Sequence, residues 1–102
     1  MHRGILLAVA AAGILAAPVA QADEALLKKH NCVACHQMDK KMVGPAYIEV
    51  AKKYKGQKDI AVKLAEKVKK GGQGAWGPVP MPPNPQIPDA DIKKMVDFIL
   101  AR

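Results

Sequence analysis

The two cysteines of the chain, Cys32 and Cys35, stand three residues apart, and His36 follows them directly in the sequence C-V-A-C-H. This pattern, C-x-x-C-H, is the attachment signature of c-type haem. Two thiols at this spacing can each bond one vinyl group of the same porphyrin, and the adjacent imidazole is then placed under the ring to bind iron. This interpretation predicts a chain that folds around a covalently bound porphyrin.

Three other uses of the motif fit the rest of the chain less well. A Cys32–Cys35 redox disulfide of the thioredoxin type calls for alternating strands and helices, a pattern that this sequence lacks. A zinc site needs four ligands, and only His30 is left over, in the same turn. A copper or other thiolate site could use two cysteines and one histidine, but it would not need the long loop described below.

The N-terminus carries the features of an export signal. Arg3 precedes an apolar run over residues 4–20, and residues 20–22 read A-Q-A, the small-x-small pattern of a cleavage site. The run is interrupted by Pro18 and is shorter than the about 20 residues that a bilayer core requires, which disfavours a stable membrane anchor. We interpret residues 1–22 as a cleaved signal peptide and residues 23–102 as one domain.

The predicted domain is poor in large side chains. Its only aromatic residues are Tyr47, Tyr54, Trp76 and Phe98, so a chain of this size would struggle to fill a core unaided. A bound porphyrin supplies the missing apolar bulk.

Hydrophobic periodicity predicts an all-α fold of about four helices and no strand. Asp23 favours a first helix over about residues 23–30, and Pro45 opens a second over residues 46–54. We expect Asp59 and Asp89 to cap the last two helices. In the final helix an apolar stripe recurs every three or four positions: Ile92, Met95, Val96, Ile99 and Leu100.

Residues 71–88 hold four glycines and six prolines in 18 positions, a composition that excludes regular structure. The segment also contains the only tryptophan, Trp76, and a methionine, Met81. We therefore expect an ordered loop that wraps over the bound group.

Position in the chain favours Met81 as the sixth iron ligand, because the flanking prolines can hold it stiffly against the ring. Met38 and Met42 follow the proximal histidine too closely to reach the opposite face, and Met95 lies on a core stripe. Two alternatives stay open: Met81 could be a gap-filling apolar residue, and His30 could be the sixth ligand.

The full chain has 16 Lys+Arg against 9 Asp+Glu, a formal charge of +7. Its lysines occur in scattered pairs, the predicted domain has no arginine except Arg102, and aromatic residues do not alternate with the basic ones. This pattern disfavours nucleic acid as a partner. It fits either a basic docking surface for acidic proteins or ordinary solvated helix faces.

Three stretches in this order resemble the small class I bacterial cytochromes c of the cytochrome c-551 type, which carry electrons in the periplasm. They are Cys32–His36, Met42–Tyr47 and Gln73–Asn84. The resemblance covers nearly the whole predicted domain. It implies the small class I cytochrome c fold, with about four helices around one covalently bound haem c.

The same resemblance implies a role for each matching residue. Cys32 and Cys35 form the thioether bonds to the haem, and His36 and Met81 are the axial pair on its iron. With both axial positions filled by protein, no site is open for oxygen or substrate, which argues against an enzyme.

Three further contacts are implied around these residues. The carbonyl of Pro45 accepts a hydrogen bond from the other ring nitrogen of His36. Trp76 donates its indole N–H towards a haem propionate, and Asn84 lies near the sulfur of Met81. Lys67 stands where many relatives have an arginine near the propionates.

We expect a soluble periplasmic monohaem protein, acting as a monomer, that carries single electrons in a respiratory chain. The resemblance implies a quinol-oxidising complex as donor and a nitrite reductase or terminal oxidase as acceptor, each with an acidic docking surface. A haem enzyme or gas sensor in which Met81 dissociates and a metal-binding module without haem are the alternatives.

Overall fold

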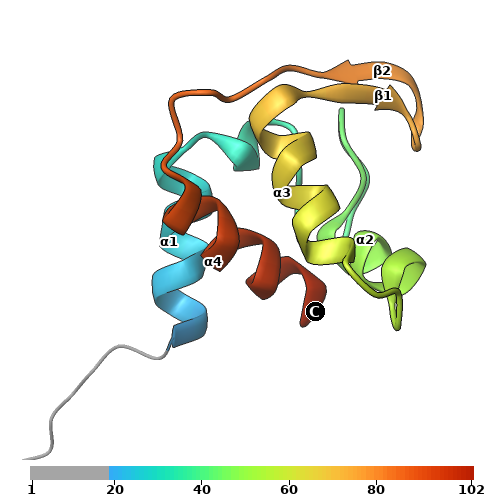
Figure 1. The fold of residues 1–102 in the computed structure, drawn as a ribbon. Helices are drawn as coiled ribbons and strands as arrows, with labels where there is room; N and C mark the ends of the chain where they lie inside the picture. The colour runs from blue at the N-terminus through green and yellow to red at the C-terminus, as the bar shows by residue number, and fades with distance from the viewer. Residues whose placement is uncertain (1–18) are drawn as a thin grey trace, which may run out of the picture.

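The computed structural model describes residues 19–102, with side chains from residue 23. Its elements are, in order, α1 (Val19–Lys29), the 3-10 turn η1 (Cys32–Ala34), α2 (Tyr47–Tyr54), α3 (Ile60–Lys70), β1 (Gly72–Gly74), β2 (Gly77–Met81) and α4 (Asp89–Leu100). The predicted fold class is confirmed, with the addition of one small antiparallel hairpin that runs across the top of the helices in Figure 1. Residues 1–18 of the predicted signal peptide lie outside the described residues.

Helix α4 is the centre of the packing, because it contacts α1, α2 and α3. The predicted stripe explains this: its side chains at 92, 95 and 96 are each 2% exposed. The core cluster also contains Leu27 from α1, Tyr47 from α2 and Ile87 from the segment that precedes α4. No helix within the described residues is long and apolar enough to cross a membrane.

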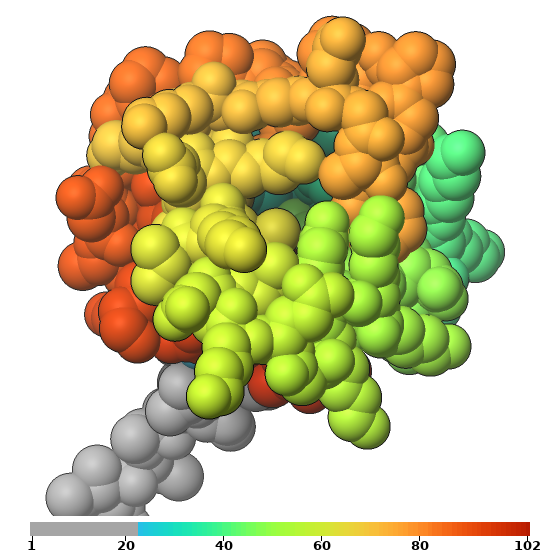
Figure 2. Space-filling view, turned by 45° about the vertical axis from the view of Figure 1, so that its right-hand side comes forward, coloured from blue at the N-terminus to red at the C-terminus, as the bar shows by residue number. Residues whose placement is uncertain are grey.

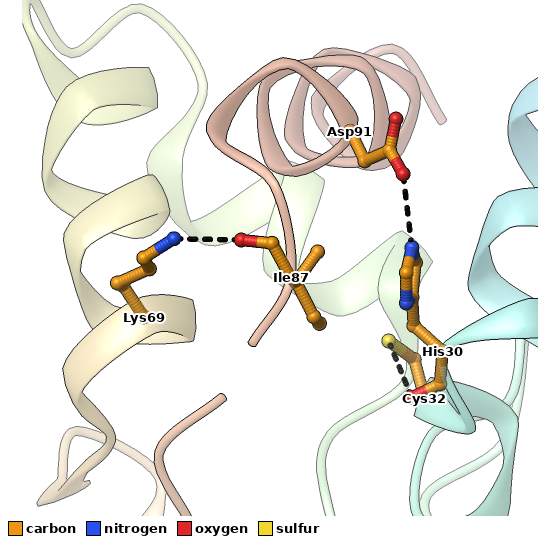
Figure 3. A network of polar contacts seen from close by, with 5 residues as sticks. All are labelled: His30, Cys32, Lys69, Ile87 and Asp91. Atoms are coloured by element: carbon orange, nitrogen blue, oxygen red, sulfur yellow. Dashed lines mark hydrogen bonds and ion pairs between the residues drawn. The ribbon is translucent and has the colours of Figure 1, made fainter. Parts of the chain in front are cut away.

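Two polar links tie α4 and the segment before it to the rest of the fold (Figure 3). His30 Nε2 lies 3.1 Å from Asp91 Oδ2, which joins the end of α1 to the first turn of α4. The ammonium of Lys69 on α3 donates to the carbonyl of Ile87 at 2.6 Å and lies 2.9 Å from the carboxylate of Asp89. Both links cross long stretches of sequence, so they fix the helices relative to one another.

The expectation of no regular structure over residues 71–88 is wrong. Strands β1 and β2 pair with Gly72 opposite Met81 and Gly74 opposite Gly77, and the register is irregular between these pairs. The two glycines at the turn have φ of 100° and 113°, values that glycine adopts at little cost. Prolines at 78 and 80 are tolerated because both strands of a two-stranded sheet are edges, which leaves alternate N–H groups unpaired.

Of the two predicted helix caps, the position of Asp59 is confirmed and that of Asp89 is wrong. Asp59 occupies the N-cap position of α3 but has a left-handed φ of 61° and makes no side-chain capping bond. Asp89 is the first residue of α4 rather than its cap, which is Pro88. Helix α1 begins at Val19, so Asp23 lies inside it. Acidic residues near a helix start favour the helix through its dipole without having to cap it.

Candidate cofactor site

A mostly apolar cavity of about 340 Å³ lies under the hairpin, within the range of about 300–1,000 Å³ found for ligand sites. Every element of the described fold contributes to its lining. Figure 2 shows the face on which the molecule is hollowed, between the hairpin and helices α2 and α3. Six of the seven predicted site residues line the cavity: Cys32, Cys35, His36, Pro45, Trp76 and Met81.

The two thiols are presented by the short turn η1. Asn31, in a left-handed conformation with φ of 60°, turns the chain from α1 into this 3-10 turn. The turn closes through backbone hydrogen bonds from Cys35 and His36 to the carbonyl of Cys32, at 3.2 and 3.0 Å. Both cysteines are free and half-buried, and burial raises the pKa of the Cys32 thiol above its ordinary value. Burial thus favours the neutral form of the Cys32 thiol at the cavity wall.

The imidazole of His36 is fixed from three sides. Its Nδ1 lies 2.8 Å from the carbonyl of Pro45, so that Nδ1–H donates and Nε2 keeps a free lone pair. The Tyr47 ring stacks on it, with centroids 5.1 Å apart and planes 20° from parallel. A Cβ on Gly44 would lie only 2.8 Å from Nδ1 and 2.9 Å from Nε2, so this loop must carry glycine. The Pro45 contact is the one that the resemblance implies.

Met81 is the last residue of β2, and the backbone around it is tightly anchored. A Cβ on Gly71, which has a φ of +77°, would lie 2.6 Å from the Met81 carbonyl oxygen. Just beyond, the backbone N–H of Asn84 donates to the carbonyls of Val68 and Lys69 at the end of α3, both at 3.1 Å. These contacts hold the end of β2 against α3.

Two predicted positions take other partners in the structure. The Asn84 side-chain amide donates to the carbonyls of Val68 and Pro82, at 3.3 and 3.2 Å, and Asn84 does not line the cavity. His30, the alternative sixth ligand, pairs with Asp91 and is also absent from the cavity lining. Within the described residues, no cluster of three or more His, Cys, Asp or Glu side chains could hold a metal ion.

Two features of the site could not be predicted from the sequence. The Tyr47 hydroxyl is buried and has no hydrogen-bond partner among the described residues, and burial raises the pKa of this phenol far above its usual range. At the cavity mouth, Lys53 lies over the ring of Trp76 at 4.6 Å from its centroid. Neither feature has a local sequence signal, because each depends on residues brought together by folding.

The residues present fit a haem c. Two thiols from one turn, an imidazole with a free Nε2 and a thioether all meet at one apolar cavity. The Cytochrome c family model matches residues 21–102. The chain belongs to the cytochrome c family.

This cytochrome c is 52% identical over 91 residues to cytochrome c-552 of Nitrosomonas europaea, covering 89% of this chain and 88% of the relative. It is 46% identical over 99 residues to cytochrome c-551 of Pseudomonas aeruginosa, covering 95% and 94%. The crystal structure of wild-type Nitrosomonas europaea cytochrome c552 matches with a TM-score of 0.75 and 50% identity, over 76% of this chain and 96% of that one. The predicted resemblance is confirmed.

Membership of the family establishes the cofactor and the general activity. The protein binds one covalently attached haem c, as cytochromes c do, and the two cysteines of its single C-x-x-C-H motif are consistent with that attachment. Cytochromes c act in electron transfer together with partner proteins.

Proposed function

We propose that this protein is a soluble, monomeric, periplasmic electron carrier that is not an enzyme. In this proposal Cys32 and Cys35 hold the haem by thioether bonds, and His36 and Met81 are the axial ligands of its iron. The observation that carries the proposal is that these four side chains line a single apolar cavity, although His36 and Met81 are 45 positions apart in the chain.

The surroundings of the two proposed ligands suit electron transfer. When bound, the haem supplies an iron that changes its oxidation state by one electron. The neutral, soft thioether of Met81 favours the ferrous state, whereas the hydrogen bond that Nδ1–H of His36 donates to the Pro45 carbonyl makes the imidazole a better donor to iron. Because the protein fills both axial positions, it offers oxygen or substrate no place to bind, and the site stays rigid between the two states.

The lysines at the cavity support docking to acidic partners. Lys41 and Lys67 line the cavity, and neither has a carboxylate partner within the described part of the chain. Elsewhere the described lysines that pair with nearby carboxylates are Lys52, Lys69, Lys70 and Lys93. Unpaired positive charge at the site would steer acidic redox proteins to it. We propose a quinol-oxidising complex as the donor and a nitrite reductase or terminal oxidase as the acceptor.

The visible spectrum of the purified holoprotein tests the ligation. We expect sharp low-spin bands and the weak long-wavelength band from thioether to ferric iron, and we expect Met81→Ala to lose the weak band. Met42→Leu, at an exposed methionine, is the matched control and should keep it. A ferric spectrum of Met81→Ala that equals the wild-type spectrum would show that Met81 is not the ligand.

Other spectra of the wild-type protein would favour the alternative functions. A high-spin spectrum, or one that changes when small ligands are added, would favour a haem enzyme or sensor. The absence of a Soret band would favour a metal-binding module without haem.

The salt dependence of the reaction with a redox partner tests the docking. The rate should fall as ionic strength rises, and Lys41→Gln should reduce that dependence. Lys93→Gln removes the same charge from a lysine paired with Asp97 on α4 and should have less effect. A rate that does not change with salt contradicts the docking proposal and leaves the haem ligation intact.

The export proposal has a direct test. Cleavage of residues 1–22 predicts that the mature protein begins at Asp23, which intact mass spectrometry of the periplasmic fraction would show. A mature protein that retains residues 1–22 contradicts this proposal.

A further inference from the structure

The tip of the hairpin is fastened to α2 by one lysine. The ammonium of Lys53 donates to the carbonyl of Ala75 at 2.9 Å and lies 4.6 Å from the ring centroid of Trp76. The Tyr54 ring meets the Trp76 ring edge-on, with centroids 6.4 Å apart, and Lys53 lies 5.7 Å from the Tyr54 centroid. We call this set of four residues, Lys53, Tyr54, Ala75 and Trp76, the Lys53 clasp.

The hairpin has few other attachments. In the described fold, β1 and β2 make their extensive backbone contacts with each other and with no helix. A two-stranded hairpin is marginally stable by itself. Its base is held at α3 by the close packing of Gly71 on Met81 and by the hydrogen bonds of Asn84. The clasp is the corresponding attachment at the other end, where Trp76 both lines the cavity and is 38% exposed.

We propose that Lys53 is a positioning residue that keeps the tip of the hairpin closed over the cavity and thereby limits the access of external ligands to the iron. The inference rests on the proposed ligation by Met81. If the tip left α2 while the base stayed on α3, the cavity would open at Trp76, and an external ligand could reach the iron and replace the sulfur of Met81. In that exchange an iron–sulfur bond would break and an iron–nitrogen bond would form, without oxidation or reduction.

The clasp contains a charge-assisted hydrogen bond and a cation–π contact at an exposed site. Loss of the Lys53 ammonium removes both contacts, and we expect it to raise the population of the open hairpin about tenfold. Opening of this kind is local, because the α1–α4 and Lys69 links lie elsewhere in the fold.

Imidazole added to the ferric holoprotein is a suitable probe, since its nitrogen competes with a thioether for ferric iron. We expect Lys53→Gln to increase the rate of loss of the long-wavelength thioether band about tenfold. Lys53→Arg should stay near wild type, because a guanidinium can donate to Ala75 and stack on Trp76. Lys52→Gln is the matched control: it removes the same charge one residue away, where the lysine pairs with Glu49 at 3.6 Å.

Hydrogen exchange of the backbone amides gives a second measurement that does not depend on the iron. In Lys53→Gln, exchange should accelerate in β1 and β2 and stay unchanged in α1 and α4. Equal imidazole rates and equal hairpin exchange in Lys53→Gln and Lys52→Gln would overturn the inference. A wild-type ferric spectrum without the thioether band would instead refute the ligation by Met81, and hairpin exchange would then decide whether the clasp holds the hairpin.

Discussion

Replacing Gly44 by alanine tests how tightly the loop before α2 holds the imidazole of His36. The added Cβ would lie closest to Cε1 and 2.8 Å from Nδ1, whereas ordinary contact begins at 3.4 Å, so the ring or the loop must move by more than about 0.6 Å. Overpacking of this kind costs about 1–3 kcal/mol. Weakening the hydrogen bond from Nδ1 to Pro45 adds about 1 kcal/mol. We expect the variant to lose about 2–4 kcal/mol of the free energy of unfolding.

Thermal unfolding of the holoprotein measures this loss, and the midpoint should fall by at least about 10 °C for a domain of this size. The reduction potential should rise, because an imidazole without the bond to Pro45 is a weaker donor to ferric iron. Gly56→Ala is a useful control: its Cβ meets nothing within 4 Å, but its φ of +79° is strained for alanine. That variant should lose stability and keep its potential. A Gly44→Ala protein with wild-type midpoint and potential would refute the packing argument.

Two further predictions concern buried and bridging groups. Burial raises the pKa of the Tyr47 phenol, so this group ionises first in the unfolded chain and stability falls as pH rises through about 10. Tyr47→Phe should therefore gain stability relative to wild type between pH 8 and pH 11 in urea titrations; a constant difference between the two proteins would contradict this. Lys69→Gln loses the bonds to Ile87 and Asp89 and should unfold about 1–2 kcal/mol more easily, whereas the exposed Lys63→Gln should not. Coincident urea curves for the two lysine variants would count against the Lys69 link.

Most of the helical framework could be predicted from local patterns. Of the five residues in the predicted α4 stripe, Ile92, Met95 and Val96 are buried, because an amphipathic helix has one face to pack. Ile99 and Leu100 are half-buried, and Phe98, which the stripe did not include, is buried. The ends of helices were harder to predict. Asp59 and Asp89 have the right chemistry for a cap, but whether a side chain bonds the first turn depends on the path of the preceding loop.

The sequence analysis does not predict the hairpin, because the glycines and prolines of this segment are each unfavourable in a β-strand. Pro78 and Pro80 would disrupt a central strand because they have no N–H to donate. They are compatible with the edge strand β2 because they stand two residues apart, and alternate N–H groups of an edge strand make no bond to a neighbouring strand. The glycines that flank Ala75 and Trp76 are the signal that could have revealed the turn.

Six of the seven site residues expected from the sequence lie at one cavity, because the C-x-x-C-H motif defines a chemistry with few solutions. The contacts that support them were not predictable. Lys53 bonds to the carbonyl of Ala75, 22 positions away in the chain, and Gly44 packs against the ring of His36. Neither residue differs in local sequence from an ordinary surface lysine or loop glycine, so only the folded chain distinguishes them.

Helix α4 is the last of the described helices, and this position limits the order in which the protein can fold. This helix contacts the other three and supplies four residues to the core: Ile92, Met95, Val96 and Phe98. A chain that emerges N-terminus first therefore cannot complete its core until α4 has been synthesised. Cys32 and Cys35, in contrast, emerge early. Because the two thiols lie well before α4 in the sequence, this order allows haem attachment to precede closure of the fold.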